Sequence, residues 1–206
     1  MSQAPFTYPQ DDTVTKSDGP MPWQTVGPFF HYALPYEAGP LLVPEDHPEA
    51  FRLSGHVLDG EGRPIPDALV EIWQAGPDGT FSQRTGIYEK PTTFRGFGRS
   101  STDADGEYSF VTLKPAGVST VDGQPQAPHI AMSVFARGML RRAVTRVYFD
   151  DESDANRTDP LLAEVGPDRG TTLVARTAEG GYRFDVRFQG EQETVFLDVF
   201  DEESPD

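Results

Sequence analysis

Several short stretches of the chain alternate between hydrophobic and polar residues. In YRFDVRFQ (182–189), aromatic and aliphatic side chains alternate with Arg183, Asp185 and Arg187. A period of two residues is typical of a β-strand that buries one face. On this basis the sequence predicts eight strands, over residues 51–59, 68–75, 107–113, 129–136, 142–149, 171–176, 182–189 and 193–200.

Turn-forming residues separate the predicted strands, and the chain holds 20 glycines and 19 prolines. Asp-Ala-Asp-Gly at 103–106 is a strong turn signal, while Arg137-Gly138 and residues 189–191 predict two hairpins. Only residues 158–165 carry a helical pattern, and that helix is short. The sequence therefore predicts an all-β fold, a β-sandwich of about eight strands with Gly/Pro-rich turns and one short helix.

The predicted sandwich is a single domain over residues 21–200, preceded by a flexible arm over 1–20 and followed by a frayed tail over 201–206. Residues 22–44 (PWQTVGPFFHYALPYEAGPLLVP) have neither helical nor strand periodicity. They are too apolar to remain in water. We expect this segment to wrap over a surface, either its own or that of a partner.

Charge and composition exclude several classes of function. The chain of 206 residues has 33 acidic and 17 basic residues, a net charge of −16, and no cysteine. Nucleic-acid binding needs a basic surface, and thiolate chemistry, disulfides and iron–sulfur clusters need cysteine. No apolar run approaches the roughly 18 residues of a membrane span. The first 20 residues do not resemble a signal peptide, so we expect no membrane association and a cytoplasmic location.

The residue pattern alone reveals no active site. The four histidines, His31, His47, His56 and His129, form no metal-binding pair of the usual spacing. The chain also lacks a GxSxG nucleophile turn and a phosphate-binding glycine loop. Each histidine is more simply interpreted as a packed or solvated side chain.

Longer motifs carry a family resemblance. They are PWQTVGPF near the start, GFGRSSTDADGEYSFVTLKP and APHIAMSVFARG in the middle, and YRFDVRFQGEQETVF near the end. In this order they resemble the intradiol aromatic-ring dioxygenases, from about Gln24 to Phe200. The resemblance implies a β-sandwich, and Fe(III) held by two tyrosinates and two histidines, where O2 cleaves a catechol ring between its hydroxyls.

This chain departs from the family at the positions of the iron ligands. The resemblance places Phe81 and Val118 where the tyrosines stand, and His129 and Ala131 where the histidine pair stands. A nearby family arginine corresponds to Gln126. Tyr88 and Tyr108 occupy no ligand position, and Tyr108 fits the core. Phenylalanine, valine and alanine offer no metal ligand, so we expect no metal and no catalytic residue in this chain.

Three interpretations remain open at this point. The chain is a non-catalytic subunit that completes an active site on a homologous, iron-bearing β chain, in an αβ hetero-oligomer. Alternatively, it is a β-sandwich binding or structural module that shares only the fold. The third interpretation is an enzyme with a relocated iron site. The first is preferred because the ligand set is lost while the flanking motifs persist.

The resemblance also implies residues that reach the partner's pocket, where a small aromatic carboxylate and O2 react. These substrate-binding residues are Thr25, Phe29 and Arg137. Residues 137–146 concentrate four arginines, Arg137, Arg141, Arg142 and Arg146. An arginine fork suits a carboxylate, and local cations offset the acidic chain's field. Some of these arginines are equally able to pair with the acids at 150–152.

Overall fold

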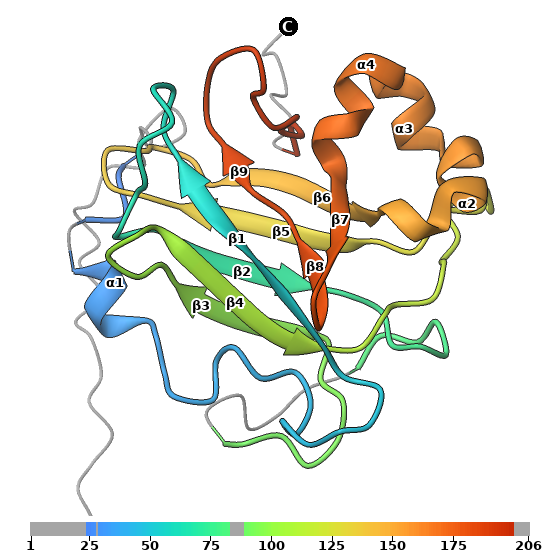
Figure 1. Ribbon diagram of the computed structural model, residues 1–206, viewed down its shortest axis with the longest axis horizontal. Helices are drawn as coiled ribbons and strands as arrows, with labels where there is room; N and C mark the ends of the chain where they lie inside the picture. The colour runs from blue at the N-terminus through green and yellow to red at the C-terminus, as the bar shows by residue number, and fades with distance from the viewer. Residues whose placement is uncertain (1–23, 28, 83–88, 200–206) are drawn as a thin grey trace, which may run out of the picture.

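The computed structural model describes residues 24–27, 29–82 and 89–199 (Figure 1). The predicted arm over 1–20, the predicted tail over 201–206, and Tyr88 lie outside the described residues. The strands are β1 Phe51–Leu58, β2 Leu69–Trp73, β3 Phe97–Ser101, β4 Glu107–Thr112, β5 Ile130–Phe135, β6 Ala143–Phe149, β7 Val174–Ala178, β8 Gly181–Arg183 and β9 Val186–Arg187.

The strands form two facing layers (Figure 1). One layer is antiparallel and follows the order β3-β2-β5-β6. The other follows β7-β8-β1-β4, with β9 also paired to β1, and a short parallel pairing of β6 with β7 joins the layers. The predicted all-β sandwich is confirmed, and so is the hairpin at Arg137-Gly138, which connects β5 to β6.

The core lies between the layers and follows the predicted alternation. Leu53 and Val57 from β1 lie beside Tyr108 and Phe110 from the adjacent strand β4 on the inner face of one layer, and all four side chains are almost fully buried. The Tyr108 hydroxyl donates a hydrogen bond of 2.5 Å to the carbonyl oxygen of Phe184. Burial raises the pKa of Tyr108 well above its ordinary value, so this hydroxyl stays protonated and acts as a structural donor.

Two predicted strands differ in the structure. Residues 182–189 form β8 and β9 with a break, because the Asp185 carboxylate accepts the His56 amide at 2.8 Å, where a ladder would use a backbone carbonyl. The predicted strand over 193–200 forms no ladder over 193–199, so the predicted hairpin is reduced to a turn, in which Glu193 N bonds Gly190 O at 3.0 Å and Thr194 N bonds Arg187 O at 2.9 Å. Instead, the hydroxyls of Thr172 and Thr145 bond the Val195 backbone. Residue 200 is outside the described range.

The prediction missed one strand and three of the four short α-helices in the described residues. The strand β3 was not predicted because FGRSS contains a glycine and few hydrophobic residues. Gly98 is needed there, because a Cβ at this position would collide with the Leu42 side chain.

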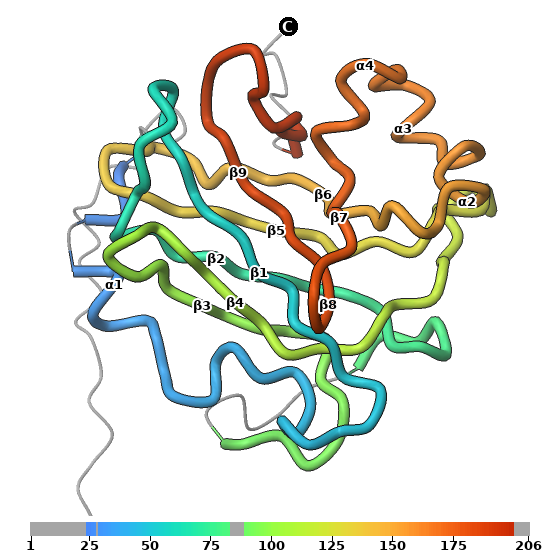
Figure 2. The backbone as a smooth tube through the Cα atoms, in the orientation of Figure 1, coloured from blue at the N-terminus to red at the C-terminus, as the bar shows by residue number. Residues whose placement is uncertain are grey.

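The helices are α1 Phe30–Ala33, α2 Ser153–Thr158, α3 Pro160–Val165 and α4 Pro167–Gly170, with 3-10 turns at Asp150–Glu152 and Thr171–Leu173. The predicted helix over 158–165 corresponds to α3. The other three are too short to show a helical period. Figure 2 shows α2, α3 and α4 as one excursion between β6 and β7.

The excursion is fastened to the sandwich by one buried carboxylate. Asp159 is fully buried and caps the N-terminus of α3 by accepting from the amides of Leu161 and Leu162. The same carboxylate accepts from the Tyr148 hydroxyl and the Ala127 amide, each at 2.9 Å. Four donors therefore satisfy one anion, which is the condition for burying it.

We expect Asp159→Asn to lower the free energy of unfolding by about 2–4 kcal/mol, since the amide nitrogen would meet a donor at one of its bonded positions. Chemical denaturation followed by tryptophan fluorescence measures this loss. The matched control is Asp154→Asn on α2, whose carboxylate pairs with Arg157 at 2.9 Å on an exposed surface. That change should cost less than about 1 kcal/mol. Equal, small losses in both variants would contradict the role given to Asp159.

The proline-rich segment is divided between the chain's own surface and solvent. Residues 38–43 are hydrogen-bonded into the gap between β3 and β4, through Arg99 N to Gly39 O at 2.8 Å and Leu42 N to Val111 O at 2.8 Å. Leu42 and Val43 are fully buried. Before position 35 the large apolar side chains of Val26, Phe29, Tyr32 and Leu34 are exposed, whereas that of Phe30 is buried.

Candidate functional site

The N-terminal part of the described chain exposes apolar side chains beside the β5–β6 hairpin. Phe29 is 74% exposed and Tyr32 is 75% exposed, and Thr25 is also exposed. A cavity of about 210 Å³ separates this segment from the hairpin. Its lining residues are Gln24, Val26, Phe135, Ala136, Met139, Leu140, Arg141 and Arg142. The structure thus brings the surroundings of Thr25 close to the arginine-rich hairpin, although they are over 100 residues apart in the sequence.

Arg137 lies at the tip of this hairpin and its side chain is two-thirds exposed, at 66%. Its Nε forms an ion pair with Asp67, whose side chain is largely buried. This contact ties the hairpin tip to Asp67, while two-thirds of the Arg137 side chain stays accessible to solvent. The sequence pattern did not reveal Asp67, because 70 residues separate it from Arg137.

The other arginines of the cluster have different surroundings. Arg141 and Arg142 line the cavity next to the N-terminal segment. Arg146 lies within β6, opposite Ala131 on β5, and its Nη1 donates to the Tyr148 hydroxyl at 3.4 Å. Arg146 is therefore turned toward the start of β5 and away from the hairpin tip.

The degenerate ligand positions gather at the opposite end of β5. Ala131 is paired with Trp73 at the end of β2, and Phe81 follows in the loop after that strand. The loop near Phe81 is bonded to the segment before Val118, through Ala116 N to Gly76 O at 3.1 Å. The Gln126 amide then donates to the Val118 carbonyl at 2.7 Å. The structure therefore brings the replaced positions together at one end of the sandwich.

His129 is the one remaining imidazole of this group. Its Nδ1–H donates to the Ala127 carbonyl at 2.8 Å, and its ring packs near Tyr148 with centroids 5.6 Å apart. Burial lowers the pKa of His129, and the Arg146 charge lowers it further. The ring is therefore a neutral, partly buried donor that helps to fix the strand.

The residues present do not fit the family's iron. Phe81 is 52% exposed and carries no oxygen, while Val118 and Ala131 have hydrocarbon side chains. Over residues 24–27, 29–82 and 89–199, no cluster of three or more His, Cys, Asp or Glu is placed to hold a metal ion. A ferric ion needs several anionic or imidazole ligands, and His129 alone supplies one.

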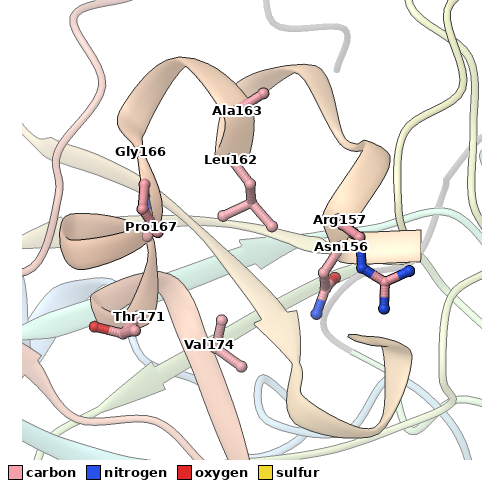
Figure 3. A pocket seen from close by; sticks show the side chains of 9 residues that line it. Asn156, Arg157, Leu162, Ala163, Gly166, Pro167, Thr171 and Val174 are labelled. Atoms are coloured by element: carbon pink, nitrogen blue, oxygen red, sulfur yellow. The ribbon is translucent and has the colours of Figure 1, made fainter. Parts of the chain in front are cut away.

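A further cavity of about 370 Å³ lies within the helical excursion (Figure 3). Leu162 and Val174 point toward each other across it. Of its polar residues, Asn156 donates to the Phe149 carbonyl at 2.7 Å and Arg157 pairs with Asp154. These groups hold the excursion in place, and the cavity offers no cluster of reactive side chains.

The helices give no sign of a membrane segment. In the described part of the chain, none is long and apolar enough to cross a bilayer.

Comparison with known proteins yields one family. The family model described as Dioxygenase matches residues 25–190. The protocatechuate 3,4-dioxygenase alpha chain of Pseudomonas putida is 40% identical over 86% of this chain and 95% of its own length. The alpha chain of Burkholderia cepacia is 42% identical, over 86% of this chain and 96% of its own length. The beta chain of Burkholderia cepacia is 35% identical over 71% of this chain and 67% of its own length.

A solved structure agrees with these relatives. The dioxygenase domain of a dioxygenase carbohydrate-binding protein fusion from Streptomyces sp. SirexAA-E has a TM-score of 0.54 at 26% identity, over 86% of this chain and all of that domain. The residues, the fold and the relatives therefore agree on one group of proteins.

Proposed function

We propose a function that starts from one premise: this chain belongs to the intradiol dioxygenase family. Within it, the chain serves as the α subunit of a protocatechuate 3,4-dioxygenase, an oxidoreductase of aromatic compound catabolism. The reaction combines 3,4-dihydroxybenzoate with O2 to give 3-carboxy-cis,cis-muconate. Both oxygen atoms enter the product, so no external reductant is consumed.

One observation carries the assignment of the subunit's role. Three of the four ligand positions, Phe81, Val118 and Ala131, are unable to bind iron, while the surrounding motifs and the fold are intact. We propose that Fe(III) is carried by a homologous β chain, and that this chain lends residues to that partner's pocket. The beta-chain relative supports the existence of such a partner.

The geometry of β5 supports a contribution in trans. Arg137 follows Ala131 by six residues along an extended strand and its turn, which corresponds to about 20 Å. Arg137 and Thr25 therefore lie far from this chain's own degenerate positions. This separation supports the proposal that the side chains at the hairpin end serve a pocket on another chain.

Each proposed substrate-binding residue has a definite task. Arg137 binds the carboxylate of 3,4-dihydroxybenzoate through its guanidinium group, since the side chain is 66% exposed even while it is paired with Asp67. Thr25, on the neighbouring N-terminal segment, supplies its hydroxyl and its backbone polar groups for hydrogen bonds to the substrate. Phe29, which is 74% exposed, has no hydroxyl and supplies an apolar wall that excludes water. None of the three performs bond cleavage.

Electrostatics explains why the arginines are concentrated at the hairpin. The net charge of −16 repels an anionic aromatic substrate at long range. Arg137, Arg141 and Arg142 create a local positive field beside the N-terminal segment. This field raises the substrate concentration where the partner's pocket must lie. The exposed aromatic side chains of the N-terminal segment, Phe29 and Tyr32, provide the contact surface for the β chain.

Co-expression with a β chain tests the proposed function. We expect the two chains to co-purify as a red-brown complex with one iron per αβ pair, whereas this chain purified alone should be colourless and contain no stoichiometric iron. Metal analysis and visible absorption spectroscopy provide the measurements. If this chain elutes as a monodisperse monomer in the presence of the β chain, the subunit role is wrong. Stoichiometric iron in the chain alone would reveal a relocated site.

A further inference from the structure

A second arginine-rich cavity lies on the β7–β8–β9 side of the molecule. Its volume is about 450 Å³, and it is largely polar. The lining residues are Thr171, Thr172, Val174, Arg176, Arg183, Phe184, Asp185, Arg187, Gln192 and Thr194. Three arginines face a single carboxylate, so the cavity carries a positive charge on a chain whose net charge is −16.

The arrangement of these arginines is unfavourable without a counter-ion. Arg176 on β7 and Arg183 on β8 are direct cross-strand neighbours. Like charges in this position repel and destabilise a strand pair. Arg183 also donates to His56 and pairs with Asp185 at 3.3 Å, so part of its charge is compensated. In the described residues, no carboxylate is paired with Arg176 or Arg187.

The positions of the charges indicate the kind of anion that would bind. Arg187 follows Arg183 by four residues along the same face, a separation of about 13 Å along an extended chain. Asp185 lies between these two arginines on the same outward face, whereas the Phe184 side chain is buried in the core and Val174 adds a partly buried apolar contact. Because Arg176, Arg183 and Arg187 come from three separate strands, an anion with two or three carboxylates can engage more than one guanidinium group at a time, which a monocarboxylate cannot. The cavity thus matches a short carbon skeleton with carboxylates at its ends, each held by an arginine fork.

We propose that this cavity is a binding site for a small di- or tricarboxylate, with Arg176 and Arg187 as its principal anchors. Binding relieves the repulsion between Arg176 and Arg183 and tightens β7 against β8. The ligand therefore stabilises the strands that connect the helical excursion to the second layer of the sandwich. This site is independent of the proposed subunit role, since it uses none of the residues at the β5–β6 hairpin.

Isothermal titration calorimetry with citrate tests the proposal, at fixed pH and ionic strength. The sample is the full-length chain in its complex with the β chain, or alone if the two do not associate, so that the two proposals fail separately. We expect one saturable site per chain. Arg176→Gln and Arg187→Gln should each weaken citrate binding about tenfold or more, because each removes a charge-assisted contact. Acetate and inorganic phosphate should bind at least tenfold more weakly than citrate.

The matched control is Arg169→Gln on α4, which removes the same charge outside the cavity. It should leave citrate affinity unchanged. In thermal unfolding, ligand-free Arg176→Gln should be at least as stable as the original chain, but a given citrate concentration should stabilise the original chain more than the variant. A loss in Arg169→Gln equal to that in Arg176→Gln, an affinity for phosphate equal to that for citrate, or no saturable binding would each overturn the proposal.

Discussion

Replacing Arg137 by alanine in the αβ complex should raise the KM for 3,4-dihydroxybenzoate by roughly 10- to 100-fold. A charge-assisted hydrogen bond to a carboxylate contributes about 1.5–3 kcal/mol, and its loss from the bound ground state appears in KM. Steady-state kinetics with the co-expressed complex measures the effect. Turnover of catechol, which has no carboxylate, should change much less, because Arg137 has no group on that substrate to bind.

The matched control for this experiment is Arg63→Ala. Arg63 is an exposed arginine whose Nε pairs with Asp59 at 2.9 Å, just as the Nε of Arg137 pairs with Asp67. It lies in the turn after β1 and has no proposed contact with substrate. Its replacement should leave both substrates unaffected. If Arg137→Ala impaired 3,4-dihydroxybenzoate and catechol equally, Arg137 would hold the subunit interface and its substrate role would be withdrawn.

Gly55→Ala should prevent the chain from folding, with a loss of more than about 4 kcal/mol in stability. Gly55 lies in the middle of β1, where the Phe184 amide bonds the Ser54 carbonyl at 2.8 Å. A Cβ on Gly55 would overlap the carbonyl oxygen of Phe184. The hydrogen bond holds the two backbones too close together to admit a Cβ. Alanine at position 55 would therefore break this contact and separate β1 from the 184–185 segment. The yield of αβ complex and its urea denaturation midpoint measure the loss.

Gly170→Ala serves as the control for that substitution. Gly170 is also buried, but a Cβ there would meet only the Leu162 side chain, at an ordinary contact distance of 3.7 Å. Alanine also favours helix over glycine, so the change should be neutral or slightly stabilising. Normal folding of Gly55→Ala would show that β1 and the 184–185 segment are less tightly apposed than described here.

The sequence predicts the strands whose side chains alternate between the core and the outer face. The alternation over 51–59 and 107–113 identifies β1 and β4 because one face of each is buried. It fails where a distant side chain replaces a backbone partner. Asp185 interrupts the strand over 182–189 by accepting the His56 amide, and no local pattern reveals that contact.

The same reasoning explains which site residues could be predicted. The replaced ligand positions follow from the family resemblance, since each lies within a recognisable motif. The ion pair of Arg137 with Asp67, and the juxtaposition of Arg176 with Arg183, depend on how strands far apart in the sequence are aligned. Charge counting cannot identify them, because arginines on separate strands resemble any other solvated cations until the register is known.

The bonding of residues 38–43 has a consequence for how the chain avoids aggregation. β3 and β4 are the terminal strands of the sheet order, and their free edges would otherwise be templates for adding a strand from another molecule. Gly39 and Pro40 accept amides from β3 and β4, and Leu42 donates back to β4. The edges are thus capped from within the chain. Any chain that associates at these two edges must then do so through side chains, whose shape and charge select a partner far more strictly than a bare backbone would.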